Sequence, residues 1–380
     1  MAATMKAKAL IWGLLISLAG CAGVSGPALP PRAQVLADLD KANTHWQQQH
    51  PPAETPFWNV AAYHTGNLEA YRVTGNAAYR RYSEAWAEHN NWSGATSPDK
   101  QAWKYNYGET PEHVLFGDWQ TCFQVYADLH QLQPEPRKIA RAREVMEYQM
   151  STPNTDYWWW VDGLYMGMPV MTRLYRETGN RQYLDKLYAY YSHTNAVMFD
   201  AEVGLYYRDA RYVYPAHRSV NGKKDFWARG DGWAFAALAR VLADLPPDDP
   251  HRADYVARLQ TMAAALLPLQ QPDGYWARSL MDPAHAPGPE TSGTAFFTFG
   301  LLWGINHGVL ERDRYLPAAL RGWTYLSTVA LQADGRVGYV QPIGDRAIPG
   351  QVVDRNSTAH FGVGAFLLAA AEMVRLLDRH

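Results

Sequence analysis

This sequence lacks the motifs that mark several common classes of enzyme. Its 13 His residues show no His-Glu-x-x-His or other ligand spacing, so we expect no catalytic metal. It contains no Gly-x-Ser-x-Gly elbow, phosphate-binding loop or dinucleotide fingerprint, and we therefore expect no cofactor. It also lacks an excess of charge of one sign. The formal net charge is −2, which argues against nucleic acid as a partner.

Cysteine is nearly absent, with 2 residues, Cys21 and Cys122. Cys21 ends the stretch 18–21, which resembles the bacterial lipoprotein box. This stretch follows an apolar run at 9–18 that is too short to span a bilayer. We expect cleavage before Cys21 and lipidation of that residue. Cys122 then remains as the one thiol, and an intrachain disulfide is excluded.

The chain is thereby divided into three predicted parts. Residues 1–20 form a lipoprotein signal peptide, residues 21–31 form a tether, and residues 32–380 form the folded domain. Ala22, rather than Asp, follows the lipidated position. We therefore expect a cell-envelope lipoprotein on the outer membrane of a Gram-negative cell, on its periplasmic or its surface face. The lipid is the only expected contact with the membrane.

Alternation of polar and apolar residues, which marks strands, is missing from residue 32 onward, whereas helical periodicity is present almost everywhere. Stretches 70–79 and 174–183 share a pattern around Thr-Gly-Asn, in which Gly suits a helix end and Asn the next helix start. Such repeats predict an array of helical hairpins. The twelve predicted helices are 33–49, 57–73, 76–89, 113–132, 135–151, 163–178, 180–198, 231–244, 250–270, 292–308, 313–331 and 357–378.

The even-numbered predicted helices differ from the odd-numbered ones. Most even ones begin with small residues and polar groups, and the odd ones carry more charge. We expect an all-α fold, an (α/α)6 toroid of six helical hairpins, in which six apolar inner helices are surrounded by six amphipathic outer ones. If the inner helices run parallel, the long loops at 90–112, 200–226 and 271–291 line a single cleft.

Aromatic side chains are abundant, at 13% of residues with 15 Trp and 24 Tyr. Carbohydrate clefts use such flat rings to stack on sugar faces. Trp158–Trp160 form a run that fits a cleft wall better than a core layer, and Asp162 follows it directly. Asp162 stands where a helix N-cap would stand. A carboxyl packed against indoles also loses solvation, so its pKa rises and it can act as a general acid.

Asp118 occupies the matching position one hairpin earlier, beside Trp119. It fits a helix cap, and it also fits a second carboxylate facing the same cleft. Two carboxylates in one cleft push their pKa values apart.

The stretch from Trp227 to Trp233 places Arg229 between two indoles. A guanidinium there suits a substrate carboxylate, with the rings holding a pyranose, or it pairs with a neighbouring Asp. Thr291 and Ser292 begin a later inner helix and are further binding candidates, although Thr291 fits a capped helix start better.

Five stretches taken in order resemble glycoside hydrolase family 105, the unsaturated rhamnogalacturonyl hydrolases, which are related to the unsaturated glucuronyl hydrolases of family 88. The stretches are Asp118–Cys122, Trp160–Met166, Trp227–Trp233, Glu290–Ala295 and Phe361–Ala369. The resemblance covers about residues 33–378. It implies the (α/α)6 fold and the removal of a terminal 4,5-unsaturated uronic acid from oligosaccharides made by lyases.

The resemblance also implies roles for individual residues. Asp162 matches the family's proton donor and Asp118 its second carboxylate, while Arg229 and Trp233 match residues at the uronate site. Trp160, in the expected cleft wall, and Trp227, beside Arg229, are further candidates for substrate binding. One departure concerns a His that relatives often carry after a Leu-Tyr step. Here the candidates for its place are Tyr207, Arg208 and His217.

The implied reaction protonates C4 of the vinyl ether and hydrates C5, with Asp162 as the acid. Two alternatives stay open: a polysaccharide lyase on the same toroid, and a surface lipoprotein that binds oligosaccharide without turnover. The sugar next to the uronate is rhamnose, a sulfated residue or an amino sugar.

Overall fold

The structure is a computed structural model that describes residues 28–379. The predicted signal peptide, Cys21 and the tether up to residue 27 lie outside the described residues. Within the described part, nearly all regular structure is α-helical, and the one sheet pairs β1 (Phe199–Asp200) with β2 (Leu205–Tyr206).

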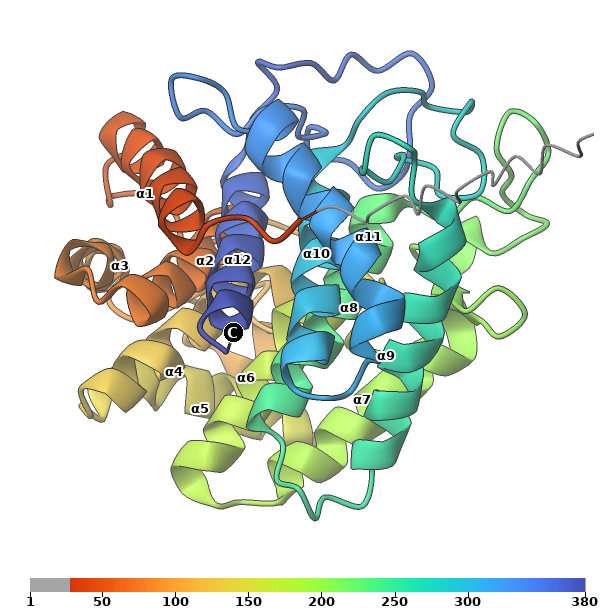
Figure 1. The fold of residues 1–380 in the computed structure, drawn as a ribbon. Helices are drawn as coiled ribbons and strands as arrows, with labels where there is room; N and C mark the ends of the chain where they lie inside the picture. The colour runs from red at the N-terminus through yellow and green to blue at the C-terminus, as the bar shows by residue number, and fades with distance from the viewer. Residues whose placement is uncertain (1–27, 380) are drawn as a thin grey trace, which may run out of the picture.

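Six helices form a closed inner ring (Figure 1). Along the chain each packs on the next, and the last packs on the first. They are α2 (Trp58–Thr74), α4 (Cys122–Leu132), α6 (Asp162–Thr178), α8 (Ala228–Asp244), α10 (Thr291–Asn306) and α12 (His360–Leu377). The outer helices are α1 (Arg32–Gln49), α3 (Ala77–His89), α5 (Arg137–Ser151), α7 (Gln182–Met198), α9 (Arg252–Leu266) and α11 (Arg312–Tyr325). The (α/α)6 toroid is therefore confirmed.

Burial separates the two rings as the sequence predicted. Every residue of α10 is buried, whereas α3 buries only Tyr79, Ser83, Trp86 and Ala87, a single helical stripe. α12 is long and apolar enough to cross a membrane, yet 83% of it is buried inside the ring, which makes it a core helix. Gly364 lets α12 approach α2 closely, because a Cβ there would overlap the carbonyl oxygen of Ala62.

The repeated Thr-Gly-Asn stretches end helices as expected. Gly75 and Gly179 adopt left-handed backbone with φ of 69° and 68°, which residues with a Cβ rarely adopt. Asn76 Oδ1 accepts a hydrogen bond from Ala78 N, and Asn180 Oδ1 accepts one from Gln182 N, each at 3.0 Å. The repeat therefore joins one helix of each hairpin to the next.

Three segments differ from the sequence prediction. The helix expected at 113–132 begins only at Cys122, because the chain before it makes turns and the 3₁₀ helix η2 (Gly117–Trp119). The end of the predicted helix 313–331 is the π-helix η5 (Leu326–Ala330). Two short strands lie in the predicted loop 200–226, where Phe199 pairs with Tyr206. The remaining short elements are the 3₁₀ helices η1 (Lys100–Ala102), η3 (Ala210–Tyr212) and η4 (Leu267–Leu269).

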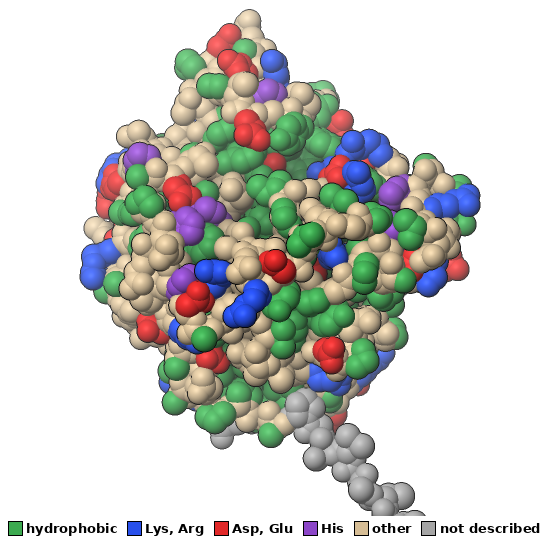
Figure 2. Space-filling model, turned by 90° about the horizontal axis from the view of Figure 1, so that it is seen from above, with side chains coloured by type: hydrophobic (Ala, Val, Ile, Leu, Met, Phe, Trp, Pro, Cys, Tyr) green, Lys and Arg blue, Asp and Glu red, His purple; other side chains and the backbone are tan. Residues whose placement is uncertain are grey.

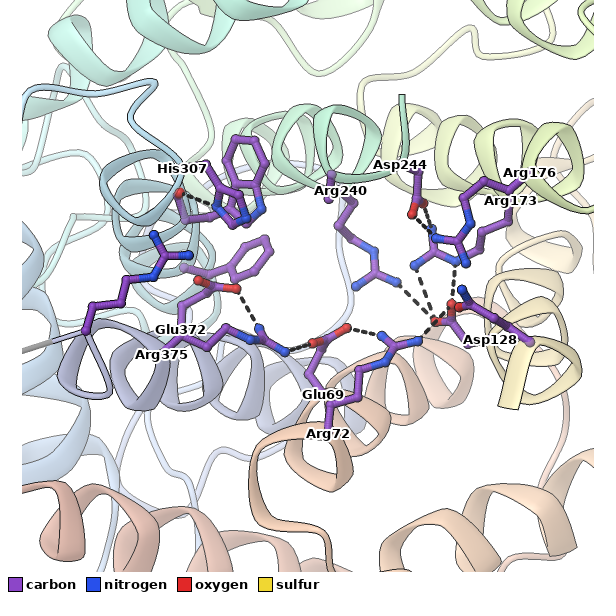
Figure 3. Close-up of a pocket in the computed structure, with 15 residues that line it drawn as sticks. Glu69, Arg72, Asp128, Arg173, Arg176, Arg240, Asp244, His307, Glu372 and Arg375 are labelled. Atoms are coloured by element: carbon purple, nitrogen blue, oxygen red, sulfur yellow. Dashed lines mark hydrogen bonds and ion pairs between the residues drawn. The ribbon is translucent and has the colours of Figure 1, made fainter. Parts of the chain in front are cut away.

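The inner helices run parallel, because residues near the C-terminal ends of all six line one pocket of about 460 Å³ (Figure 3). We call it the lower pocket. Arg173 Nε donates to Asp128 Oδ1 at 2.8 Å, and Arg240 points into the space between the helices. Glu69 accepts from both Arg72 and Arg375, which joins α2 to α12. Cations are favoured at helix C-termini, where the helix dipoles carry partial negative charge.

The ion pairs of the lower pocket make the free energy of unfolding depend on pH. Burial alone would raise the pKa of Glu69, but Arg72 and Arg375 outweigh it and hold the pKa at about 2. A carboxyl whose pKa is lowered by folding stabilises the fold above its unfolded pKa, and this stabilisation disappears as the pH falls toward the folded value. Through Glu69 we expect a loss of about 3 kcal/mol of unfolding free energy between about pH 5 and about pH 2.

Urea unfolding across this pH range, for the wild type and for Glu69→Gln, measures the effect. The variant should be destabilised by a similar amount at neutral pH, because it leaves buried arginines without their partner, and its stability should fall less steeply in acid. Glu147→Gln is the matched control, since the Arg143–Glu147 pair is roughly half exposed and should contribute less than about 1 kcal/mol. Equal pH slopes for the wild type and Glu69→Gln would contradict the assignment.

Candidate active site

A cavity of about 680 Å³ opens at the other end of the ring, above the N-terminal ends of the inner helices. We call it the upper cavity. Figure 2, which looks down on this end, shows a hollow with hydrophobic side chains and flanking charged groups. Its lining comes from the start of α2, the turns around η2, the start of α6 and three loops. The lining includes Thr55, Phe57, Trp58, Tyr107, Glu109, Phe116, Asp118, Trp159, Trp160, Asp162, Arg208, Arg211, Ile343 and Asp345.

The loops that line the upper cavity were predicted in part. The segments 90–112 and 200–226 do contribute, through Tyr107 and Arg208, whereas 271–291 contributes no lining residue. Instead, the long connection between η5 and α12 supplies Ile343 and Asp345.

Asp162 is the first residue of α6 and lies on the cavity wall. It is not the N-cap, as the sequence suggested, because Val161 holds that place. The Oδ2 atom of Asp162 is buried and has no hydrogen-bond partner. Burial raises the pKa of Asp162, against the opposing charges of Arg208 and Arg229. The group therefore has the environment of a carboxyl whose protonated form is favoured by burial.

Asp118 lies in η2 and lines the same cavity, with 6% of the residue exposed. No residue within 28–379 forms a hydrogen bond with its carboxyl. Burial raises the pKa of Asp118 well above its ordinary value, and the charge of Asp162 raises it further. The sequence predicted that the two carboxyls push their pKa values apart, with Asp162 as the proton donor. The larger shift falls instead on Asp118, because Arg208 and Arg229 both stabilise the charge on Asp162.

Arg208 is the cation of the upper cavity nearest to these carboxyls. Its Nε atom lies 3.7 Å from Asp162 Oδ2, too far for a hydrogen bond, and has no other partner. Its Nη1 atom donates to Asp209 Oδ2 at 2.6 Å, and its guanidinium lies 5.7 Å from the Trp159 ring. The chain is positioned here by Val161 N, which donates to Arg208 O at 2.8 Å. Arg208 thus has donors free to take an anion while it neutralises Asp162.

The three consecutive tryptophans divide between cavity and core. Trp159 and Trp160 line the upper cavity, as expected for a sugar-binding wall, and Trp160 packs against Phe116 with ring centroids 4.8 Å apart. Trp158 does not, because it is fully buried beneath them and packs edge-on against Tyr190. Three successive side chains cannot all point to the same side.

Arg229 does not line the upper cavity, contrary to its expected contact with a substrate carboxylate. It is buried, and it donates from Nη1 to Gln341 O at 2.6 Å and from Nη2 to Pro342 O at 2.8 Å. Its guanidinium lies between the rings of Trp227 and Phe361, at 4.5 and 4.7 Å from their centroids. Burial lowers its pKa to about 10. Arg229 therefore braces the connection that carries Ile343 and Asp345 into the cavity.

The other predicted binding residues of α8 and α10 are also internal. Trp233 is fully buried against Tyr165 and Phe296, and Trp227 Nε1 donates to Gln341 Oε1. The hydroxyls of Thr291 and Ser292 bond to Gly338 O and Glu290 Oε1. None of these four residues lines the upper cavity. Trp227, Thr291 and Ser292 use their polar side-chain atoms within the fold, whereas Trp233 Nε1 is buried without a hydrogen-bond partner. Substrate contact by these four residues stays a prediction.

Of the three candidates for the missing His, only Arg208 reaches the upper cavity. Tyr207 is buried, stacks on Phe226 and donates its hydroxyl to Asp200 Oδ2 at 2.8 Å. His217 Nε2 lies 2.9 Å from Asp225 Oδ2, outside the lining.

Sequence reasoning missed Trp58, which lines the cavity at the start of α2. The sequence does carry a signal for Trp58, because an aromatic ring at the start of the even-numbered predicted helix 57–73 is placed like those of the other inner helices. Ile343 and Asp345 gave no signal, since they lie in an irregular connection between two predicted helices.

Comparison with known proteins places this geometry in a family. The model of Glycosyl Hydrolase Family 88 matches residues 34–377. An unsaturated 3S-rhamnoglycuronyl hydrolase of Formosa agariphila is 33% identical over 90% of this chain and 91% of its own. A solved glycosyl hydrolase family 88 structure from Bacteroides vulgatus is 59% identical, with a TM-score of 0.90, over 91% of this chain and 99% of its own. A solved structure named a polysaccharide lyase is 61% identical, with a TM-score of 0.90, over 92% and 99%.

The family match spans the whole ring, from α1 to α12, and therefore includes both carboxyls and the arginine of the upper cavity. It confirms the resemblance to the group formed by families 88 and 105. This chain belongs to glycoside hydrolase family 88 and is a glycoside hydrolase.

Proposed function

We propose that the protein removes a terminal 4,5-unsaturated uronic acid from oligosaccharides produced by lyases. The observation that carries the proposal is the pair of buried carboxyls, Asp118 and Asp162, beside the free donors of Arg208 in one cavity. The names of the Formosa agariphila relative and of a 30% identical relative from Alteromonas sp., both unsaturated 3S-rhamnoglycuronyl hydrolases, support this substrate class. They also favour rhamnose as the sugar next to the uronate.

An unsaturated uronate is a vinyl ether, with its C4=C5 double bond conjugated to the carboxylate and C5 bonded to the ring oxygen. A proton delivered to C4 creates an oxocarbenium ion shared by C5 and the ring oxygen. Water then adds at C5 and loses a proton, which gives a hemiketal. The hemiketal opens to a ketone at C5 as the ring oxygen takes up a proton, and the hemiacetal left at C1 then collapses to an aldehyde and releases the next sugar as its free hydroxyl. The route needs one group that first gives a proton to carbon and then takes one from water.

We assign that group to Asp162. Its Oδ2 atom has no partner to release before reaction, and its pKa is already raised by burial. Asp118, which lines the same cavity and makes no hydrogen bond with its carboxyl within residues 28–379, is assigned to orient the water. Arg208 is assigned to the uronate carboxylate. When the uronate carboxylate binds the Arg208 guanidinium, that positive charge no longer lowers the pKa of Asp162. Asp162 then takes up the proton that it must donate.

Isotope labelling tests the chemistry. In heavy water, deuterium should enter at C4 of the product, and oxygen from labelled water should be bonded to C5. Mass spectrometry and NMR of the products locate both labels. Labelled oxygen at C1 of the uronate instead would mean direct hydrolysis of the glycosidic bond, and the hydration route would be wrong.

A polysaccharide lyase is the second candidate, favoured by the name of the 61% identical structure. A lyase forms an ultraviolet-absorbing double bond, whereas the proposed reaction consumes one. Falling absorbance on unsaturated disaccharides supports hydration, and rising absorbance on intact polysaccharide supports the lyase. Binding with no change in absorbance on either would favour the non-catalytic surface protein. The lipid anchor at Cys21 stays a prediction from the sequence.

A further inference from the structure

Three side chains beside the upper cavity come together from distant parts of the chain. His50 caps the C-terminus of α1, Glu54 lies in the loop before α2, and His360 is the first residue of α12. One potential ligand atom from each lies within 4.8 Å of the others. Among residues 28–379, this is the one group of three His, Cys, Asp or Glu side chains with the spacing of a metal site.

The ring of His50 is held in a fixed orientation. Its Nδ1 atom lies 3.0 Å from Trp46 O, and the ring stacks on the indole of Trp46 with centroids 3.8 Å apart. A carbonyl accepts only a hydrogen, so Nδ1 carries the proton and Nε2 keeps its lone pair. Metal-binding His residues are commonly oriented in this way, by a bond from the other ring nitrogen to a carbonyl.

A second Trp-x-x-x-His pair shows what is special at His50. His307 ends α10 with its Nδ1 2.9 Å from Trp303 O and its ring stacked on Trp303. The carbonyl bond alone is therefore a way of ending a helix. His50 differs because another imidazole and a carboxylate lie within ligand distance of it.

His360 supplies the second observation. Its Nε2 atom is buried and lies 2.6 Å from Glu54 Oε2, yet at an angle that makes no hydrogen bond. A buried polar atom without a partner is costly to the fold. A cation between His50, Glu54 and His360 would give this nitrogen a partner.

We propose that His50, Glu54 and His360 bind one divalent transition-metal ion of the zinc class. Two imidazoles and one carboxylate suit such an ion, whereas Ca²⁺ and Mg²⁺ prefer oxygen ligands alone. Tetrahedral Zn²⁺ at about 2.0–2.1 Å from each ligand separates the ligand atoms by about 3.3 Å. Glu54 and His360 would therefore move apart slightly, and a water molecule would fill the fourth position.

The ion would link the segment before α2 to the start of α12, and these two segments pack together at one wall of the upper cavity. Glu54 is followed by Thr55, Phe57 and Trp58, which line the cavity, and Phe361, next to His360, stacks on Trp58 with centroids 5.3 Å apart. The proposed role is structural, because the three ligands themselves do not line the cavity.

The test uses the full chain without a polyhistidine tag, stripped of metal by a chelator. Calorimetric titration with ZnCl₂ should give one ion per chain, and Co²⁺ in its place should show the visible absorption of a tetrahedral site. His50→Gln and His360→Gln should each weaken Zn²⁺ binding more than about tenfold. His307→Gln, the matched control, should bind as the wild type does. In the wild type, Zn²⁺ should slow hydrogen exchange of the segment 50–59.

No uptake of Zn²⁺ by the wild type would overturn the proposal, as would unchanged binding by His50→Gln. Equal weakening by His307→Gln would show that the binding is not at this site. His50 is only partly buried at a helix end, so His50→Gln keeps the test decisive if His360→Gln fails to fold.

Discussion

Asp162→Asn is expected to lower kcat by about 10³-fold or more while leaving substrate binding within a few-fold of the wild type. The amide has nearly the same shape as the carboxyl but can neither deliver a proton to C4 nor accept one from water. Loss of absorbance of the unsaturated uronate measures turnover, and calorimetric titration measures binding. Because both proton transfers are assigned to Asp162, the effect should be the largest of any substitution in the upper cavity.

Asp345→Asn is the matched control for this result. Asp345 lines the same cavity, but its carboxylate already accepts hydrogen bonds from Tyr212 and Arg346. We expect it to change kcat by less than about tenfold, since it takes no part in proton transfer. If Asp162→Asn kept most of its turnover while Asp118→Asn lost it, the two carboxyls would have to exchange roles.

Arg208→Lys is expected to lower kcat/KM by about 10²-fold, which corresponds to about 2.7 kcal/mol of transition-state stabilisation. Lysine keeps the charge but loses the planar fork that can hold a carboxylate with two hydrogen bonds. Arg208→Gln removes the charge as well. Because Arg208 lowers the pKa of Asp162, its removal should raise that pKa and move the basic limb of the kcat/KM profile to higher pH.

Arg229→Lys separates binding from bracing. Arg229 donates to the carbonyls of Gln341 and Pro342, and a lysine cannot make both hydrogen bonds in the same way. The main expected effect is therefore a lower midpoint temperature of unfolding, and the loss of kcat/KM should be the smaller effect. A larger loss of kcat/KM in Arg229→Lys than in Arg208→Lys, at equal stability, would restore Arg229 as the residue that binds the uronate.

The ring of helices was predictable because each inner helix has an apolar composition that only a core can accommodate. The start of α4 was not, because the turns before Cys122 carry the same apolar spacing as the helix. Sequence also predicted that Asp162 and Asp118 face one cavity, and both line it, since a carboxyl beside tryptophans at a helix start carries a local signal. Their individual pKa values could not be predicted, because these depend on Arg208, which a loop brings to them.

Arg229 shows why the sequence does not reveal which side chains line the upper cavity. An arginine between two tryptophans has the composition of a sugar-acid site, but its acceptors are backbone carbonyls 112 and 113 residues away. Backbone carbonyls occur at every residue and leave no mark in the sequence. The sequence likewise gives no sign that His50, Glu54 and His360 lie close together, because they meet only when the ring closes.

Closure of the ring also determines the order in which the chain can fold. Arg375 on α12 pairs with Glu69 on α2 across 306 residues of sequence. Contacts between such distant segments are slow to form, because a long loop must close before they stabilise anything. While a ribosome is still making α12, the apolar face of α2 has no partner and is open to aggregation or to a chaperone. The wall that Trp58 builds with Phe361 is thus among the last parts to form, and hydrolase activity should appear only after the helical hairpins are already in place.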